Sequence, residues 1–484
     1  MSFRHLLHVV GAVVAAAGAS MFLPVIVGVL YGEWSDAIAI AVSATVTVGV
    51  GAGLWRAFPK PGELTSREGF AAVGMSWILL VLFGALPYLL TQSITDPSSA
   101  VFEAAAGFTT TGASVMGVEE FASFSHAMFF WRSLTQWMGG MGIIVLSIAI
   151  LPLLGLGAVQ LAKAEAPGPT PDRLTPRFRE TAKRLWLVYV VLTVVEMLLL
   201  WAGDMTLFEA VNHSLTTMST GGFSTNPGSL GAYSAYVQWV VIVFMLLAGA
   251  SFALHYKWLK EPLVHFRSAE FRLYLGITLL AATAVGIAQW NGAFEESVRT
   301  GLFTAATIIT TTGYGTENFA LWAPALQVGI VGMMFIGGMA GSTSGSVKVY
   351  RLEVLSVASR MDVRRLIYPR GVFVTRVGKN PVPDAIVEAI QTFFLLYMFA
   401  FMTGTFLLSV VEWLSGGSLA LVDTVSAVAS ALGNVGPGLG EVGPAGNYAG
   451  VSAMGKWVLS ALMIVGRLEI LPIIILFNRD LWRR

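Results

Sequence analysis

Long apolar runs separated by short polar turns dominate the sequence. Each run is long enough to cross a bilayer as an α-helix, for which about 20 residues suffice. The pattern therefore predicts ten membrane-spanning helices, at residues 6–31, 37–55, 69–91, 125–153, 182–203, 234–256, 270–290, 321–350, 384–412 and 451–477. The first run is too long for the apolar core of a cleaved signal peptide, so we interpret it as a retained span.

Four shorter apolar segments lie between these spans. Each has about 13 residues, enough for half a bilayer at about 1.5 Å per residue. They occupy residues 99–111, 207–220, 299–312 and 420–432. We expect re-entrant half-helices that end at mid-depth, where irregular backbone is tolerated only if it is buried in protein or lines an aqueous cavity. The negative end of each helix dipole then points at a dehydrated cation.

A glycine-containing loop follows each half-helix, and the third loop carries the most distinctive pattern. It reads Thr310-Thr311-Thr312-Gly313-Tyr314-Gly315. Glycine lets successive carbonyls point inward, and carbonyl and hydroxyl oxygens can replace the hydration shell of K⁺. Such a run also occurs by chance in ordinary turns, but a ring of carbonyls needs four copies and the chain supplies four. The predicted ion-binding residues are Thr110, Thr111, Gly112, Thr220, Gly221, Gly222, Thr311, Thr312, Gly313, Tyr314, Leu432, Gly433 and Asn434.

The loops recur as part of a larger unit. A second glycine-bearing position follows each loop within the next apolar run, at Gly139-Gly140, Gly249, Gly337-Gly338 and Gly466. The expected fold is therefore an all-α polytopic membrane protein, with four pseudo-repeated units of helix, pore loop and helix around one central pore, plus two accessory amino-terminal helices. The expected divisions are residues 1–66 for the accessory pair and 67–165, 166–266, 267–378 and 379–484 for the four repeats.

Composition and charge agree with this class. Of 484 residues, 55% are hydrophobic and 12% are charged, which is too apolar for a water-soluble protein of this size. The absence of cysteine excludes disulfides and thiolate metal sites, and a net charge of +1 gives no case for a nucleic-acid partner. Threading the spans from a cytoplasmic amino terminus places most of the 29 basic residues inside and all four glycine loops outside. We therefore expect both termini in the cytoplasm.

A second glycine-rich segment interrupts the run at 321–350. Residues 337–346 contain four glycines and three serines, so a helix should break there. The alternative is a close-packing stripe of small residues between helices, but the density of glycine and serine exceeds that pattern. Arg467 lies in the last apolar run, where an arginine costs about 2.5 to 3.5 kcal/mol on insertion scales and should face water or a partner.

These features resemble the TrkH-type pore subunit of the bacterial Trk/Ktr potassium-uptake family. The resemblance covers the whole chain and rests on the four divergent loops, the accessory pair and residues 337–346. It implies potassium-selective uptake, with Rb⁺ also accepted and no organic cofactor, across the lipid bilayer of the bacterial inner membrane. It also implies a homodimer docked on a TrkA-type cytosolic nucleotide-binding ring. Loops one and four lack the Gly-Tyr-Gly continuation, which bears on the strictness of selection against Na⁺.

The family places its intramembrane gate in the glycine- and serine-rich loop. By this resemblance, the gate contains Gly337, Gly338, Gly341, Ser342, Thr343, Ser344 and Gly345. Arg467 is assigned to the gate on its own chemistry. Its guanidinium is expected to hydrogen-bond backbone carbonyls of the broken neighbouring helix, to place a positive charge at the pore constriction as a barrier to cations, or to do both.

Three functions remain open from the residues alone. The first is a gated, passive potassium conduit, and the second is potassium symport coupled to sodium or protons. The third is an intramembrane hydrolase using Ser342 or Ser344, which would need a nearby base; we expect no enzyme. Other polar residues are interpreted as packing or capping groups, namely His213, Glu103, Glu209 and Asp423, and Arg132 is expected to anchor at the external interface.

Overall fold

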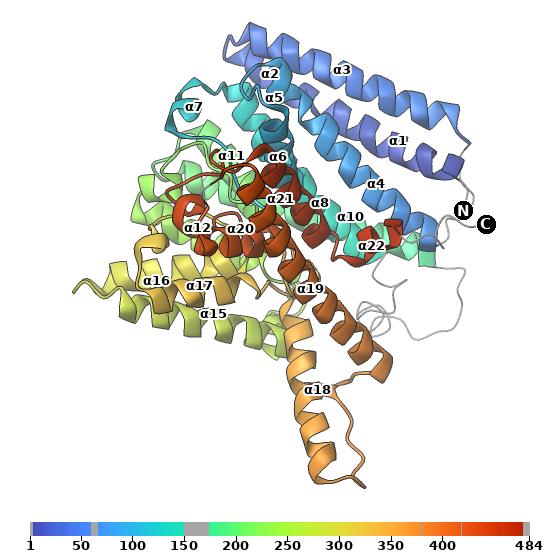
Figure 1. Cartoon of the computed structure of the whole chain (residues 1–484), viewed down its shortest axis with the longest axis vertical. Coiled ribbons are helices and arrows are strands. Elements are labelled where there is room, and N and C mark those ends of the chain that lie inside the picture. Colours follow the sequence, from blue (N-terminus) through green and yellow to red (C-terminus); the bar gives the residue numbers. More distant parts are fainter. Residues whose placement is uncertain (1–2, 60–65, 150–173, 379, 418, 478–484) are drawn as a thin grey trace.

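The structure is a computed structural model that describes residues 3–59, 66–149, 174–378, 380–417 and 419–477. Within these residues the chain is almost entirely helical (Figure 1). The exceptions are a two-residue antiparallel pair, β1 (Arg376–Val377) with β2 (Asn380–Pro381), and a parallel bridge between Ile336 and Val347. The prediction of an all-helical protein is confirmed.

The amino-terminal helices pack as a close antiparallel pair. Helices α1 (Phe3–Ser20) and α2 (Phe22–Leu30) form one span, and α3 (Trp34–Ala57) returns beside it (Figure 1). Small residues allow the two backbones to approach, since a Cβ added to Gly18 would lie 2.7 Å from the Val48 nitrogen. Glu33, in the turn between them, accepts hydrogen bonds from the His126 and Ala127 nitrogens at 2.8 and 3.0 Å. The pair is thereby fastened to the start of α8.

Four short, deeply buried helices follow four longer ones. The longer helices are α4 (Ser66–Gly84) with α5 (Leu86–Leu90), α10 (Leu174–Trp201), α15 (Ala269–Ala288) and α19 (Asp384–Leu414). The short helices are α6 (Pro97–Phe108), α11 (Leu207–Met218), α16 (Phe294–Ile309) and α20 (Leu421–Gly433). Every residue of α6 from Ser98 to Phe108 is buried, as expected for a half-helix surrounded by protein.

Within the described residues, three of the four helices that follow the short ones are broken. They are α8 (His126–Ala149), α12 (Ala235–Ala248) with α13 (Phe252–Trp258), α17 (Pro324–Met334) with α18 (Val349–Ile367), and α21 (Ala453–Arg467) with α22 (Leu471–Phe477). The break between α17 and α18 was predicted. The continuous helices predicted at 234–256 and 451–477 are wrong: α12 and α13 are bent by 100°, and positive φ angles of 56° and 66° at Glu469 and Ile470 end α21.

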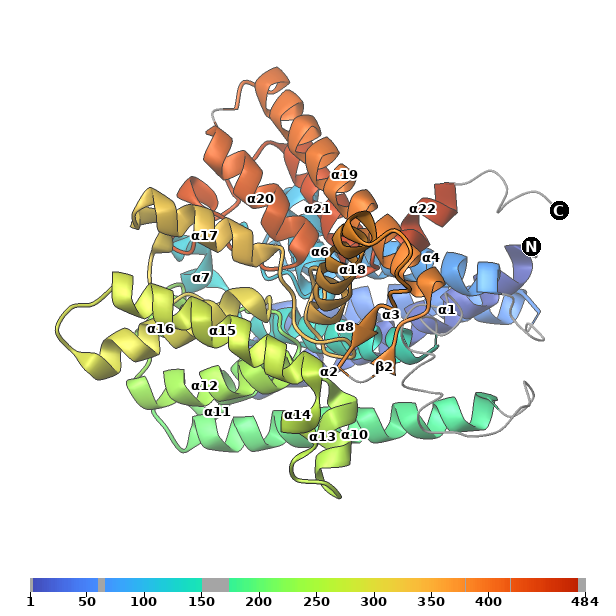
Figure 2. The ribbon, with the colours of Figure 1, turned by 90° about the horizontal axis from the view of Figure 1, so that it is seen from below.

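Short connecting helices complete the described chain. They are α7 (Val118–Ser123), α14 (Val264–Arg267), η3 (Ser229–Ala232), η4 (Phe319–Leu321) and η5 (Gly440–Val442). Seen from below, the chain passes around the molecule from α4 and α6 through α10–α12 and α15–α17 to α19–α21 (Figure 2). Helix α18 extends away from this body (Figure 1).

Six helices of the described chain are long and apolar enough to cross a membrane. They are Phe3–Leu30, Trp34–Ala57, Glu68–Leu90, Glu180–Trp201, Ala269–Ala288 and Asp384–Leu414, and the bent pair α12 and α13 adds a seventh if it is one span. Two further apolar helices, α17 and α20, are shorter. The protein is therefore a multi-span membrane protein, as its composition predicts.

Candidate functional site

The loops after the four short helices share one unusual backbone conformation. We call them loop 1 (residues 109–115), loop 2 (219–224), loop 3 (310–315) and loop 4 (434–438). Each contains a non-glycine residue in the left-handed region, with φ of 52°, 55°, 58° and 54° at Thr110, Thr220, Thr311 and Asn434. Threonine rarely adopts this conformation, and such strain is concentrated at functional sites.

A glycine stands two residues after each left-handed residue. These glycines also have positive φ, at 77°, 76°, 81° and 110° for Gly112, Gly222, Gly313 and Gly436. The residue between them donates its N–H to the preceding short helix, as from Thr111 to the Ala106 oxygen and from Thr312 to the Thr307 oxygen, at 2.9 and 2.8 Å. This caps the carboxyl end of each helix.

The four loops meet in a closed circuit. A Cβ added to Gly112 would overlap the carbonyl oxygen of Gly221 in loop 2. Equivalent close contacts occur between loops 2 and 3 and between loops 3 and 4. A Cβ added to Gly436 would lie 2.6 Å from the Thr111 oxygen, so loop 4 contacts loop 1 and the circuit is closed. The contacts that close the circuit are Gly112 with Gly221, Gly222 with Thr312, Gly313 with Val435, and Gly436 with Thr111. Only glycine permits this close approach.

Seven carbonyl oxygens of these loops have no hydrogen-bond partner among the described residues. Among the described residues, no backbone hydrogen bond reaches the oxygens of the four left-handed residues or of Thr111, Thr312 and Val435. All seven residues are buried. Buried carbonyl groups are nearly always paired, with water if not with protein, so this cluster of free oxygens is chemically suited to a cation that has shed its water.

Loop 2 departs from the other three. The Gly221 oxygen, which corresponds to those of Thr111 and Thr312, accepts a hydrogen bond from Gln136 Nε2 at 2.7 Å. Gln136 Oε1 in turn accepts from the Phe223 nitrogen at 3.1 Å. Sequence reasoning missed Gln136, because nothing in the pattern of α8 distinguishes it from a packing residue.

Loop 4 has a different register from the one that the sequence suggested. Leu432 and Gly433 were predicted to bind the ion, but both lie in the last turn of α20. Asn434, Val435 and Gly436 occupy the places of Thr110, Thr111 and Gly112. Likewise, Gly222 rather than Gly221 corresponds to Gly112 and Gly313. Glycine positions alone do not reveal this register, because an additional glycine, Gly221 or Gly433, precedes the equivalent glycine of loops 2 and 4.

Side chains tie the loops to their surroundings. The Tyr314 hydroxyl lies 2.6 Å from Thr216 Oγ1 and 3.1 Å from Thr217 Oγ1, so it fastens loop 3 to α11. Asn434 Nδ2 donates to Thr111 Oγ1 at 3.0 Å, joining loop 4 to loop 1. Tyr448, which the sequence did not single out, donates to the Gly436 oxygen at 2.9 Å. Buried side chains thus join loop 4 to loop 1 and fasten loop 3 to α11.

The glycine- and serine-rich segment forms a loop directly against loops 3 and 4. We call residues 335–347, which connect α17 to the N-cap residue of α18, the inner loop. Its two ends are paired by the Ile336–Val347 bridge, with the Gly337 nitrogen 2.8 Å from the Val347 oxygen. The Gly345 nitrogen donates to Thr311 Oγ1 at 2.7 Å, which joins the inner loop to loop 3.

The centre of the inner loop reaches across to the second short helix. Thr343 Oγ1 donates to the Met218 oxygen at 3.1 Å, at the end of α11, and lies 3.3 Å from the Ala248 oxygen. The other predicted residues hold the loop's shape: the oxygens of Gly338 and Gly341 accept from Val349 and Phe252, and Ser342 Oγ donates to the Met339 oxygen at 2.6 Å. Ser344 Oγ is buried with no partner among the described residues.

Arg467 joins the inner loop to two other helices. It is the last residue of α21 and only 2% exposed. Its Nη1 donates to the Thr343 oxygen at 2.6 Å and its Nη2 to the Gly139 oxygen at 3.3 Å. Glu469 is not its ion-pair partner; this carboxylate pairs with Arg351 in the first turn of α18. The sequence-based expectation that Arg467 bonds carbonyls of a broken neighbouring helix is confirmed.

The second set of glycines explains how closely the helices pack. A Cβ on Gly139 would overlap the Phe108 oxygen, and one on Gly466 would overlap the Leu432 oxygen. Phe108 and Leu432 are equivalent residues at the ends of α6 and α20, since each lies two residues before a left-handed residue. In these two units, the second glycine therefore lets a helix cross closely against the end of the preceding short helix.

Arg132 does not anchor at the external interface, as predicted, but is buried. It is 2% exposed, its Nε donates to Glu103 Oε1 at 2.6 Å, and its Nη1 donates to the Ser224 oxygen at 3.1 Å. Its guanidinium also lies over the Phe223 ring, 3.5 Å from the centroid. Glu103 also accepts from the Val115 nitrogen at 3.0 Å, so the pair links α6 and α8 to loops 1 and 2.

The remaining polar residues are capping and packing groups, as predicted. Glu209 caps α11 through the Thr206 nitrogen at 2.8 Å, and Asp423 caps α20 through the Ala420 nitrogen at 3.3 Å. His213 Nε2 lies 3.0 Å from Ser224 Oγ within the packed interior. In the described part of the chain, no three His, Asp or Glu side chains are grouped to hold a metal ion.

Removal of the buried arginine should destabilise the protein strongly. We expect Arg132→Met to lower the free energy of unfolding by about 3 to 5 kcal/mol, because Glu103 would keep a buried, uncompensated charge. Thermal unfolding in detergent measures this. Arg299→Met is the matched control, since its partner Glu295 is 57% exposed, and a comparable loss in both variants would contradict the argument.

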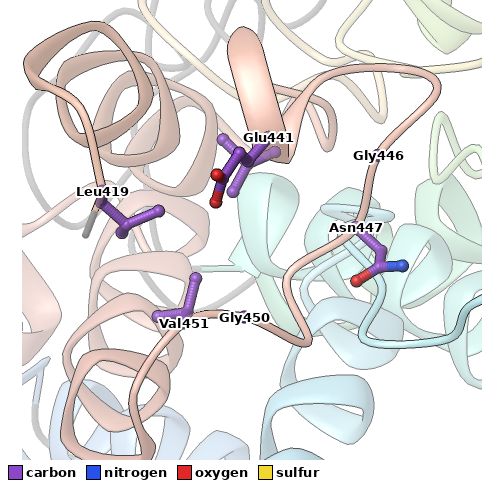
Figure 3. Close-up of a pocket in the computed structure, with 7 residues that line it drawn as sticks. Leu419, Glu441, Gly446, Asn447, Gly450 and Val451 are labelled. Atoms are coloured by element: carbon purple, nitrogen blue, oxygen red, sulfur yellow. The ribbon is translucent and has the colours of Figure 1, made fainter. Parts of the chain in front are cut away.

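A surface pocket lies beside the segment that follows loop 4. It has a volume of about 270 Å³ and is lined by Leu419, Glu441, Val442, Gly446, Asn447, Gly450 and Val451. Leu419, Glu441 and Val451 point toward the same opening (Figure 3). None of the predicted site residues lines it, so it is separate from the four loops.

Comparisons with known proteins agree with this architecture. The family model described as "TrkH: Cation transport protein" matches residues 36–273 and 289–483. The Trk system potassium uptake protein TrkH of Salmonella typhimurium is 38% identical, and that of Escherichia coli K12 is 37% identical, each with all of both chains covered. The crystal structure of the potassium transporter TrkH from Vibrio parahaemolyticus superposes with a TM-score of 0.90 at 34% identity, again covering both chains completely. The chain therefore belongs to the TrkH family of cation transport proteins and is not an enzyme.

Proposed function

We propose that this protein is a potassium-selective conduit in which loops 1 to 4 form the selectivity filter. One observation carries the proposal: a closed circuit of four buried loops in which the oxygens of the four left-handed residues and of Thr111, Thr312 and Val435 have no hydrogen-bond partner among the described residues. K⁺ is the transported ion, and Rb⁺ is accepted because its coordination is similar. The relatives' names, which state potassium uptake, support the choice of cargo.

The inner loop and Arg467 form the gate. The loop lies against the filter through Gly345 and Thr311, and Arg467 holds its Thr343 carbonyl. The gate residues are those expected from the sequence, Gly337, Gly338, Gly341, Ser342, Thr343, Ser344, Gly345 and Arg467. In the closed state the loop obstructs the path, and the guanidinium adds an electrostatic barrier to cations.

The proposal extends to the organisation of the chain. Ten spans cross the bacterial inner membrane, with both termini in the cytoplasm and the filter facing outward. The accessory pair is residues 1–66, and the four repeats are residues 67–165, 166–266, 267–378 and 379–484. The recurrence of the same left-handed residue and glycine in loops 1 to 4 supports four repeats. A homodimer docked on a TrkA-type nucleotide-binding ring follows from family membership alone.

Ion flux into liposomes tests the proposal and separates it from coupled symport. Purified protein should load ⁸⁶Rb⁺ into vesicles that hold a potassium gradient, at a rate independent of sodium and proton gradients. Flux that requires a sodium or proton gradient would establish symport instead. Absence of Rb⁺ flux from folded protein, including variants with a disrupted inner loop, would contradict the conduit.

The ring should dock on basic residues of the projecting helix. Arg364 and Arg365 are exposed near the end of α18. Replacing both by alanine should weaken association with a purified ring protein about tenfold at low salt, since each exposed charge contact is worth about 0.2 to 1 kcal/mol. A pull-down titration measures this. Replacing Arg267 and Arg272 serves as the control, and equal binding by all three proteins would exclude this site.

A further inference from the structure

A buried lysine also binds the inner loop, at the carbonyl next to the one that Arg467 binds. Lys348 is the last residue before α18 and is 7% exposed. Its Nζ donates to the carbonyl oxygen of Ser344 and lies 3.4 Å from Ser342 Oγ. Within the described chain the ammonium makes no ion pair; the charged groups close enough to act on it are Glu469, Arg467, Arg351 and Glu270.

Two buried cations therefore bind consecutive carbonyl groups of the inner loop. Arg467 binds the Thr343 oxygen from α21, and Lys348 binds the Ser344 oxygen from the start of α18. Charge-assisted hydrogen bonds are stronger than neutral ones, particularly where water is excluded. The carbonyl groups of Thr343 and Ser344 thus accept hydrogen bonds from a guanidinium and an ammonium group, respectively.

The acidic groups nearby are engaged elsewhere. Glu469 pairs with Arg351, and Glu270 Oε1 accepts from the Ala340 nitrogen at 2.6 Å. Lys348 is left with the loop itself as its hydrogen-bonding partner. A lysine that neutralised a local carboxylate would form a structural ion pair with it. Lys348 instead donates a hydrogen bond to a backbone carbonyl of the proposed gate.

We propose that Lys348 is a positioning residue that clasps the inner loop in its closed conformation and links that loop to α18. The inference rests on the proposed function, and it deepens the gating of that same site. Because α18 starts at the next residue and extends away from the body (Figure 1), a displacement of α18 withdraws the ammonium from the Ser344 carbonyl. The inner loop then loses one of its two cationic contacts.

Uptake measurements on charge variants test the clasp. Lys348→Met keeps the length of the side chain and removes its charge. We expect basal Rb⁺ uptake into liposomes without a partner protein to rise about tenfold, as follows when a closed state loses one charge-assisted hydrogen bond. Lys348→Arg should restore the parent rate. The potassium-to-sodium permeability ratio should stay at the parent value, since Lys348 makes no hydrogen bond to loops 1 to 4.

A second readout follows the loop itself. The chain contains no cysteine, so Met339→Cys, at a position 1% exposed, reports opening by its rate of maleimide labelling. Labelling should accelerate when Lys348→Met or Lys348→Gln is added to this variant. Both Lys348 variants are measured, so that the test still stands if one of them is too unstable to purify. Lys456→Met is the matched control: this lysine is also 7% exposed, but it donates to Ser99 Oγ on α6 at 3.0 Å.

The outcomes separate this inference from the proposed function. Parent-like uptake and labelling in both Lys348 variants, together with raised uptake in Arg467→Ala, would overturn the clasp and leave the conduit standing. Raised uptake in Lys456→Met equal to that in Lys348→Met would also overturn it, because the effect would then follow from loss of any buried lysine. Absence of Rb⁺ flux from every variant would overturn both proposals.

Discussion

Gly313→Ser should lower the potassium-to-sodium permeability ratio about tenfold or more, the change that corresponds to about 1.4 kcal/mol. Gly313 has a φ of 81°, where a side chain costs about 1 to 2 kcal/mol, and an added Cβ would overlap the Val435 oxygen in the next loop. Either the Gly313 backbone rotates or the Val435 carbonyl moves. Both changes displace oxygens that would coordinate K⁺. Reversal potentials under mixed potassium and sodium gradients give the ratio.

The same reasoning makes the register of loop 4 testable. Gly436→Ser should reduce the ratio as Gly313→Ser does, because Gly436 has a φ of 110° and faces the Thr111 oxygen. Gly433→Ser should affect the ratio less, since Gly433 is helical and an added Cβ would come no closer than 2.9 Å to its nearest neighbour, the Met334 oxygen. Gly276→Ser is the control, because an added Cβ there meets nothing within 4 Å. Unchanged ratios in Gly112→Ser, Gly313→Ser and Gly436→Ser would refute the filter.

Much of the helical architecture was predictable because a long apolar run in a membrane nearly always forms an α-helix. Backbone groups in lipid must be paired internally, so length and composition nearly determine where helices form. The third short helix was located from residues 299–312, although α16 begins at Phe294. The break after α17 was predictable for a different reason, since its glycines and serines disfavour a helix whatever their surroundings.

The sequence could not predict features that depend on contacts between distant segments. The bend between α12 and α13 lies at Gly249 to Ser251, and a single glycine does not specify a 100° bend. Arg132 was misplaced because an arginine between two tryptophans is typical of a membrane interface. Its partner Glu103 lies 29 residues away, and only the packing of α6 against α8 brings the two together. The register of loop 4 was predicted wrongly because the equivalence of residues among the four loops follows from their backbone angles, which glycine positions in the sequence do not reveal.

Arg467→Ala should raise basal Rb⁺ uptake without any partner protein by about tenfold or more, since even 1.4 kcal/mol between closed and open states is tenfold in population. The substitution removes the hydrogen bonds to the Thr343 and Gly139 oxygens and the buried positive charge that, in the proposed gate, opposes cations. Deletion of several residues within 338–344 should act in the same direction. Arg467→Lys should be intermediate, because it keeps the charge but loses the planar arrangement of donors.

Two controls make the result decisive. Arg299→Ala removes an arginine whose ion pair lies on α16, away from the inner loop, and should leave uptake at the parent level. Gly313→Ser in the Arg467→Ala background should lower selectivity while uptake stays high, because the filter and the gate would then act in series on one path. Uptake at or below the parent rate in folded Arg467→Ala protein would show that the guanidinium does not hold the gate closed. The Thr343 carbonyl contact would then be structural, and the barrier to ions would have to lie within the inner loop itself.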